Sequence, residues 1–188
     1  MYRLKKILAR FKLSVLRKRQ ESAPITIPDD IIAARHILIL LPPGQRELTM
    51  IKDLLPDITR VFSGGEIYIL ASPGSTVYNI FPRKGYRIMT PTSQHLDWSG
   101  LPRGNYIKSL KETGFDVLLD LNLGINYFSQ AILLSFSRAL KIGRGNHLGT
   151  PYYNLEIKSR YIRDEKNIYK SIITTIDRIK NPATIEAG

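Results

Sequence analysis

The chain has 188 residues, of which 43% are hydrophobic, and this suits one folded domain and excludes a globally disordered protein. It contains no cysteine, which excludes disulfide scaffolds, cysteine-ligated zinc, iron–sulfur clusters and thiol catalysis. Lys and Arg number 28 against 16 Asp and Glu, and the excess is concentrated in the first twenty residues, which hold no acid.

Residues 1–20 are predicted to form a basic amphipathic arm. Read as a helix, residues 2–16 place Leu4, Ile7, Leu8, Phe11 and Val15 on one stripe. The basic residues that cover the rest of the arm are Arg3, Lys5, Lys6, Arg10, Lys12, Arg17, Lys18 and Arg19. They interrupt the apolar run, so a secretory signal and a membrane-spanning helix are both excluded here.

Three interpretations of this arm stay open. It could contact an anionic membrane surface through its apolar stripe and its Lys and Arg side chains. It could pack on the domain's own sheet or remain solvated. It could contact nucleic acid, although the aromatic side chains expected of a single-strand binder are few. We expect a cytoplasmic protein of bacterial type, peripheral at the inner face of the cell membrane.

Residues 21–35 are predicted to be a linker, because Pro24 and Pro28 oppose helix formation. The domain proper is expected at residues 36–180, with a tail at 181–188. Its predicted strands are apolar runs ended by turn residues: 36–41, 66–71, 86–89, 115–121, 140–143 and 153–157. Its predicted helices are 46–62, with a kink or restart at Pro56, and then 75–81, 103–113, 126–140 and 165–180. This alternation predicts an α/β fold with a mostly parallel sheet flanked by helices.

Candidate ligand-binding residues follow the strands, because open parallel sheets bind ligands beyond the carboxyl ends of their strands. Gly44 and Gln45 begin a helix whose backbone N–H groups could meet an anion. Neither glycine-rich phosphate motif is present, and a tight turn is the alternative interpretation. Ser75 is a second candidate, for which the alternative is a helix N-cap.

Asp120 ends an apolar strand and could act as a base or as the partner of a sugar hydroxyl, or could cap the following turn. Asn122 and Asn126 follow it closely and are further ligand-binding candidates. The glycine-rich turn at residues 143–149 carries His147, a second catalytic candidate. His36, His95 and His147 share no metal-binding spacing, so neither a metal nor a cofactor is expected. Ser-His-Asp hydrolysis has no support, since G-x-S-x-G is absent.

The order of four motifs resembles a known enzyme family. They are ILILLPPGQRELT, LLPDITRVFSGGEIYILAS, LKETGFDVLLDLN and FSRALKIGRGNHLGTPYYN. Over about residues 36–158 they are similar to the N-terminal half of the heptosyltransferase-type glycosyltransferases, the lipopolysaccharide heptose family with two-domain GT-B architecture. The resemblance implies a single Rossmann-like domain that corresponds to the acceptor side.

Two departures from that family bear on function. The family has an acidic residue after the first-loop glycine, thought to act as base on the acceptor hydroxyl, and here that position is Gln45. The second domain, which binds the nucleotide-sugar donor, is not expected. One hypothesis is therefore an accessory or degenerate module of envelope polysaccharide or lipopolysaccharide biosynthesis, with a glycolipid acceptor, a homodimer partner or a donor-domain protein as its partner. A second is an active glycosyltransferase working as a dimer or with a separate donor subunit. A third is a nucleic-acid-binding or interaction protein.

Overall fold

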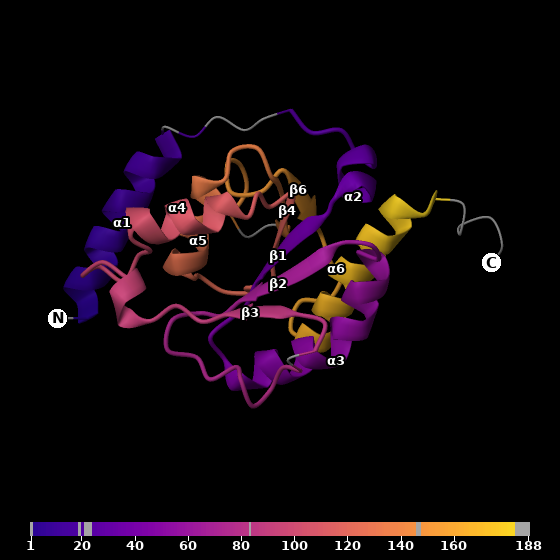
Figure 1. The fold of residues 1–188 in the computed structure, drawn as a ribbon, viewed down its shortest axis with the longest axis horizontal. Coiled ribbons are helices and arrows are strands. Elements are labelled where there is room, and N and C mark those ends of the chain that lie inside the picture. Colours follow the sequence, from indigo (N-terminus) through magenta and orange to yellow (C-terminus); the bar gives the residue numbers. More distant parts are fainter. Residues whose placement is uncertain (1, 19, 21–23, 83, 146–147, 183–188) are drawn as a thin grey trace.

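The computed structural model describes residues 2–18, 20, 24–82, 84–145 and 148–182. One sheet of six parallel strands crosses the molecule in the order β3-β2-β1-β4-β5-β6 (Figure 1). The strands are β1 (His36–Leu40), β2 (Glu66–Leu70), β3 (Arg87–Met89), β4 (Val117–Asp120), β5 (Leu140–Arg144) and β6 (Leu155–Ile157). At the centre, Ile37 of β1 pairs with Ile67 of β2 on one side and Val117 of β4 on the other.

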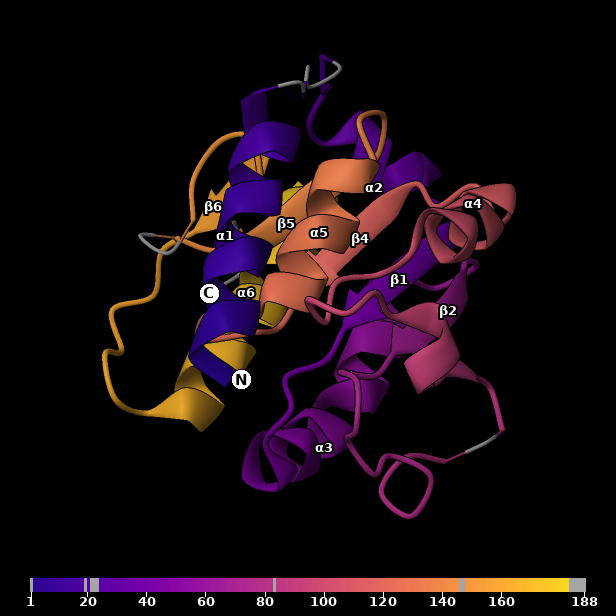
Figure 2. The same ribbon diagram turned by 90° about the vertical axis from the view of Figure 1, so that its left-hand side faces the viewer.

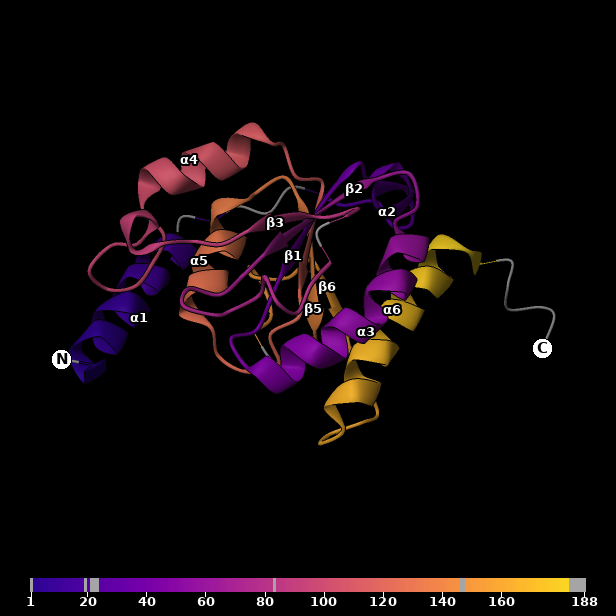
Figure 3. The same ribbon diagram turned by 60° about the horizontal axis from the view of Figure 1, so that its bottom comes forward.

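Helices cover both faces of this sheet (Figure 3). On one face lie α3 (Gln45–Val61) and α6 (Glu165–Lys180), with the short helix α2 (Asp29–Ala33) near the strand starts. On the other face lie α1 (Tyr2–Lys18), α4 (Gly104–Glu112) and α5 (Tyr127–Ser135), and a short 3-10 turn, Ser93–His95, precedes α4. The sheet is thus the middle of three layers, as its uninterrupted apolar strands require.

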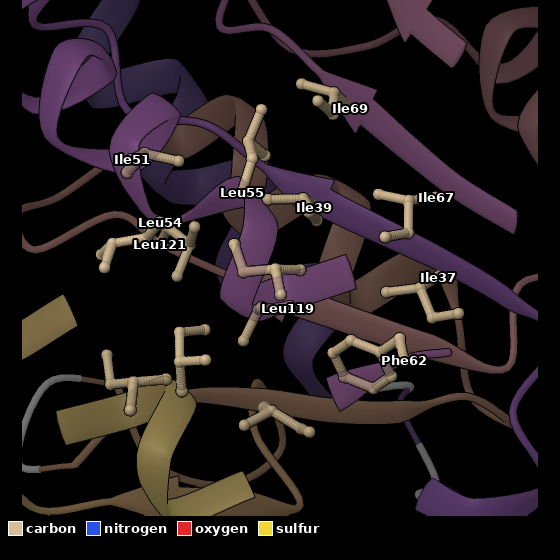
Figure 4. Packing of buried hydrophobic residues seen from close by; sticks show 14 of the residues in the cluster. Ile37, Ile39, Ile51, Leu54, Leu55, Phe62, Ile67, Ile69, Leu119 and Leu121 are labelled. Carbon is tan, nitrogen blue, oxygen red and sulfur yellow. The ribbon is translucent and has the colours of Figure 1, made fainter. Parts of the chain in front are cut away.

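Successive residues of the central strands feed two separate cores. Ile37 and Ile39 point toward α3 and α6, whereas Leu38 and Leu40 point toward α4 and α5. Figure 4 shows the first core, in which Leu119 packs among side chains from β1, β2 and α3. Both faces of each central strand are therefore dry, and the strand positions are set by the apolar runs of the sequence.

The strand order reverses direction between β1 and β4, since the chain lays down β2 and β3 on one side of β1 and then β4, β5 and β6 on the other. This is the order of the doubly wound dinucleotide-binding sheet, and its ligands bind at that switch point. The predicted Rossmann-like α/β fold is confirmed. Ligand chemistry is expected where the carboxyl ends of β1 and β4 meet.

Several predicted elements differ from the observed ones. The helix does not restart at Pro56: α3 runs through this residue, which lies on the exposed side, while neighbours such as Leu55 and Ile58 anchor the helix by burial. Residues 75–81 form turns and no helix, with Val77 buried. The helix expected at 126–140 ends at Ser135. The predicted linker contains α2, whose Ile31 is fully buried in the core.

The basic arm forms a helix, as predicted, and this helix packs mainly against α5 (Figure 2). Ala9 and Leu13 are its buried residues, in the core between the sheet, α4 and α5. Within the described part of the chain, no helix is both long enough and apolar enough to cross a membrane.

Candidate functional site

A cleft of about 540 Å³ lies at the carboxyl edge of the sheet, beside the switch point. The segments that follow β1, β2 and β4 form its floor, helix α1 and the loop at residues 99–100 form its sides, and the start of α5 closes it. Its lining residues are Lys5, Lys6, Ala9, Pro43, Ser72, Pro73, Ser99, Gly100, Ile125, Asn126, Tyr127 and Phe128. The cleft therefore combines neutral amide and hydroxyl groups with two lysines from the basic helix.

Asp120 lies beneath this cleft, only 1% exposed at the end of β4. Its Oδ2 accepts a hydrogen bond of 2.7 Å from the Tyr153 hydroxyl, and its Oδ1 accepts bonds from the backbone N–H and side-chain amide of Asn122, at 3.0 and 2.6 Å. A buried carboxylate needs such donors, because an unpaired one costs several kcal/mol. Burial and the charge of Asp120 raise the pKa of Tyr153, so this hydroxyl stays protonated as the donor.

Asn126 connects this buried network to the cleft. Its Nδ2 donates to Ser72 Oγ at 2.7 Å and to Asn122 Oδ1 at 2.8 Å, and its Oδ1 accepts from the Ser129 N–H, which caps the start of α5. Ser72 Oγ in turn donates to the Leu41 carbonyl. The ends of β1, β2 and β4 are thereby joined by side-chain hydrogen bonds, which gives the cleft a fixed floor.

The predicted ligand-binding residues lie at different depths. Asn126 lines the cleft and Asn122 lies in the network below it. Gly44, Gln45 and Ser75 are not among the lining residues: Gly44 is the N-cap of α3, Gln45 is exposed at its first position, and Ser75 Oγ donates to the Ser72 carbonyl within a turn. The catalytic role of Asp120 stays a prediction. His147 and Arg19 fall outside the described residues.

Glu47 is a carboxylate that the sequence reasoning did not single out. It occupies the third position of α3 and folds back over Gly44, the N-cap residue, and its Oε1 accepts a hydrogen bond of 3.4 Å from Tyr169. Burial and the nearby charge of Glu165 raise the pKa of Glu47 above its ordinary value, and the hydrogen bonds from Tyr169 and the Gly44 backbone oppose this only in part. A Gly-x-x-Glu spacing at a helix start was the available signal.

Three of the five residues in the apolar stripe predicted on α1 face solvent, while Leu8 and Val15 are half-buried. Leu4, Ile7 and Phe11 are 60%, 62% and 68% exposed and lie on the side of the helix opposite the buried Ala9 and Leu13. We call these three residues the outer ridge. The basic residues of α1 flank it, and Arg3, Lys5, Arg10, Arg17 and Lys18 are exposed.

One ion pair ties α1 to the loop that precedes α4. Lys12 Nζ lies 2.5 Å from Asp97 Oδ2 and 5.6 Å from the centre of the Trp98 ring. Burial acts to raise the pKa of Asp97, but hydrogen bonds from Lys12, Ser99 and the Leu101 backbone outweigh it and hold that pKa below its usual range. The helix is therefore held by a charged contact as well as by Ala9 and Leu13.

Among the residues that the structure describes, no three His, Asp or Glu side chains are grouped so that they could hold a metal ion. His36 packs edge-on against Tyr68, and His95 stacks on Tyr106 and accepts a hydrogen bond from the Thr92 N–H. Both histidines thus have structural partners.

Comparison with known proteins shows a similarity in fold between this chain and solved structures. No protein-family model matches the sequence, and no curated protein matches it. Among solved structures, E. coli heptosyltransferase WaaC with ADP matches with a TM-score of 0.56 at 14% identity, over 74% of this chain and 46% of that chain. The same enzyme with ADP-2-deoxy-2-fluoro heptose matches with a TM-score of 0.53 at 12% identity, over 74% of this chain and 47% of that one. The predicted heptosyltransferase-like fold is confirmed, and the chain spans less than half the length of these structures.

Proposed function

We propose that this chain is a glycosyltransferase-like accessory module that binds a phosphorylated glycolipid acceptor at an anionic membrane surface, in envelope polysaccharide or lipopolysaccharide biosynthesis. The observation that carries the proposal is the position of α1. The helix turns Lys5 and Lys6 toward the strand-edge cleft and exposes the outer ridge on its far side. One helix thus serves both a polar ligand and a surface.

The chemistry of the cleft suits a carbohydrate that carries negative charge. The oxygens of Asn126, Ser72 and Ser99 keep lone pairs that can accept hydrogen bonds from sugar hydroxyls, since the N–H and O–H groups of these side chains already donate within the protein. Lys5 and Lys6 supply positive charge for a phosphate or carboxylate on the same ligand. Fold likeness to a heptosyltransferase supports a saccharide as the ligand, as an analogy of fold.

The exposed side of α1 suits an anionic membrane. The helix spans 17 residues and has basic side chains on both flanks of the outer ridge and no acid. A helix of this kind lies in the headgroup region with its apolar side chains buried, and each Lys or Arg close to an anionic surface contributes about 1 kcal/mol. Membrane binding would bury Leu4, Ile7 and Phe11, and each side chain would contribute roughly 1.5–3 kcal/mol to the binding free energy if it were fully removed from water.

An accessory role is supported by the two residues that were expected to supply or replace the base, Gln45 and Asp120. The amide of Gln45 cannot accept a proton from an acceptor hydroxyl. Asp120 is buried, and each of its oxygens accepts a hydrogen bond from the protein. A partner that supplies the donor-binding half, or a second copy of this chain, would then carry the transfer step.

One observation favours the second candidate, an active transferase that obtains its donor site from another subunit. Glu47 places a carboxylate over Gly44, and burial beside Glu165 raises its pKa toward the range of a general base. In that case Glu47→Gln would abolish sugar transfer by the assembled complex without changing acceptor binding. Unchanged transfer by this variant would exclude Glu47 as the base.

Flotation with lipid vesicles tests the proposal. Vesicles of phosphatidylcholine, of phosphatidylcholine with phosphatidylglycerol, and of the latter with rough lipopolysaccharide are compared. We expect binding only to the anionic vesicles and tighter binding when lipopolysaccharide is present. Replacing the outer ridge by serine should abolish both, whereas Lys5→Gln with Lys6→Gln should remove the preference for lipopolysaccharide.

Controls distinguish a ridge variant in which α1 has unfolded from one in which α1 is folded but no longer binds membranes. Circular dichroism should show that the ridge variant keeps α1, because Leu4, Ile7 and Phe11 make no part of the core. Absence of vesicle binding together with salt-sensitive binding to DNA or RNA would contradict the proposal and favour a nucleic-acid partner.

A further inference from the structure

A second hollow lies on the other flank of α1, between this helix, α5 and the segment that leads into β6. Its volume is about 560 Å³. The polar groups at its wall are Arg10 and Arg17 of α1, Gln130 of α5, and Tyr127 and Tyr152. It adjoins the strand-edge cleft, with which it shares Ile125 and Tyr127, but the basic residues of the two hollows differ.

The two arginines carry charge that no acid balances. Among the residues that the structure describes, neither Arg10 nor Arg17 has a salt bridge or a side-chain hydrogen bond. They lie seven positions apart, two turns along the same side of α1, so both guanidinium groups can reach one anion in the hollow between them. Arginine is the side chain best suited to bind a phosphate through paired hydrogen bonds.

Gln130 adds a neutral amide to this wall. Its side chain lines the hollow although the residue is only 6% exposed, and within the described residues its amide has no hydrogen-bond partner from the protein. The polar atoms of this amide are not fully buried, so they open into the hollow and can form hydrogen bonds to a ligand there.

The two tyrosines complete the wall. Arg17 and Tyr152 both line the hollow; burial raises the pKa of Tyr152, and the positive charge of Arg17 acts in the opposite direction. Tyr127 and Leu148 add apolar surface on either side. Aromatic and aliphatic walls with a few fixed polar groups are typical of small-ligand sites.

We infer that this hollow binds a phosphate monoester carried on a sugar-like ring, with Arg10 and Arg17 on the phosphate, and Gln130 and the tyrosine hydroxyls on the ring hydroxyls. The inference goes beyond the proposed function, because this site needs neither the outer ridge nor the strand-edge cleft. The phosphate could belong to a free sugar phosphate or to a lipid head group, which have this chemistry in common.

The site is tested by titrating the full chain with soluble probes. Binding is measured by isothermal titration calorimetry and by changes in the amide NMR chemical shifts. The probes are glucose 6-phosphate, glucose and inorganic phosphate. We expect saturable binding of glucose 6-phosphate, weaker binding of inorganic phosphate and none of glucose. The double variant Arg10→Gln with Arg17→Gln should bind glucose 6-phosphate about tenfold or more weakly.

Two further variants distinguish specific binding in this hollow from nonspecific attraction of the probe to the positive charge of α1. Arg3→Gln with Lys18→Gln removes the same charge from exposed positions of the same helix, and it should leave the affinity within about twofold. Gln130→Leu should weaken glucose 6-phosphate more than inorganic phosphate. Equal losses in the two charge variants, or unchanged affinity in Gln130→Leu, would overturn the inference.

Vesicles containing phosphatidylinositol 4-phosphate provide the lipid arm of the test, with phosphatidylglycerol vesicles as the anionic control. Binding of glucose 6-phosphate in solution identifies a free sugar phosphate. A preference for the phosphoinositide that is lost in the Arg10→Gln, Arg17→Gln variant identifies a lipid head group instead. If neither probe binds in preference to its control, the inference is wrong. The double variant Lys5→Gln with Lys6→Gln should not affect binding at this second hollow. A failure of the present inference can therefore be distinguished from a failure of the proposed function.

Discussion

Because Lys141 is buried, the free energy of unfolding should rise as the pH increases from neutral to mildly alkaline. The residue lies in β5 with no exposed surface, and its Nζ donates a hydrogen bond of 2.7 Å to the Pro151 carbonyl. Burial lowers the pKa of Lys141 from 10.5 to about 8, so the side chain is still charged at neutral pH. The Pro151 carbonyl immediately precedes Tyr152 and Tyr153, which belong to the second hollow and to the Asp120 network.

The sign and size of the effect follow from this pKa. Between about pH 8 and 10 the folded protein loses the proton of Lys141 while the unfolded chain keeps it, so the unfolded state binds more protons and the free energy of unfolding rises with pH. A pKa lowered from 10.5 to about 8 corresponds to about 3 kcal/mol, of which roughly 2 kcal/mol would be recovered between about pH 7.5 and 10. Above about pH 10 the stability should fall again, because burial raises the pKa of Tyr106 to about 12.

Urea unfolding at several pH values, followed by circular dichroism, measures this rise. The rise should disappear in Lys141→Met, which keeps the length of the side chain and removes the charge. It should persist in Lys170→Met, which removes a lysine from the exposed side of α6. If the wild-type stability is flat between about pH 8 and 10, or if Lys141→Met shows the same rise, the reasoning from burial is refuted.

Three further predictions concern the supports of the two hollows. Tyr153→Phe removes the hydroxyl that donates to Asp120, so the free energy of unfolding in urea should fall by about 1.5–3 kcal/mol, and a change near zero would show that this bond is not formed. Gly143→Ala places a methyl group against the ring of Tyr153 and should cost about 1–3 kcal/mol or more in the same assay; an unchanged midpoint would mean that the ring is free to move. Asp97→Asn removes the ion pair with Lys12, so amide hydrogen exchange should quicken in α1 and not in the sheet, and wild-type α1 should loosen likewise as the pH falls below about 4. Equal exchange in variant and wild type would argue against that anchor.

Most of the fold could be predicted because the strands are uninterrupted apolar runs. Residues 36–41 and 66–71 were predicted as buried strands and correspond to β1 and β2 within one residue. The errors arose where tertiary contacts outweigh local preference. Burial of Leu55 and Ile58 carries α3 through Pro56, and burial of Val77 fixes a turn where a helix was expected.

The sites were harder to predict because their partners are distant in sequence. Asp120 could be placed at the correct edge of the sheet, but its partner Tyr153 lies 33 residues later and carries no motif. The orientation of α1 could not be predicted from the sequence either. Its buried contacts are Ala9 and Leu13, while the more apolar stripe, with Phe11, points outward. The second hollow depends on that docking, so no spacing within the sequence could indicate it.

Trp98 gives the most direct test of the proposed membrane function, because it is the one tryptophan of the chain, is 60% exposed and lies beside Lys12 on α1. Its fluorescence is measured while vesicles of phosphatidylcholine and phosphatidylglycerol with brominated acyl chains are added. The account predicts a saturable blue shift with quenching, which is absent with phosphatidylcholine alone and is lost when the outer ridge is replaced by serine. Emission that stays unchanged with anionic vesicles, or a response that is identical in the ridge variant, would contradict it.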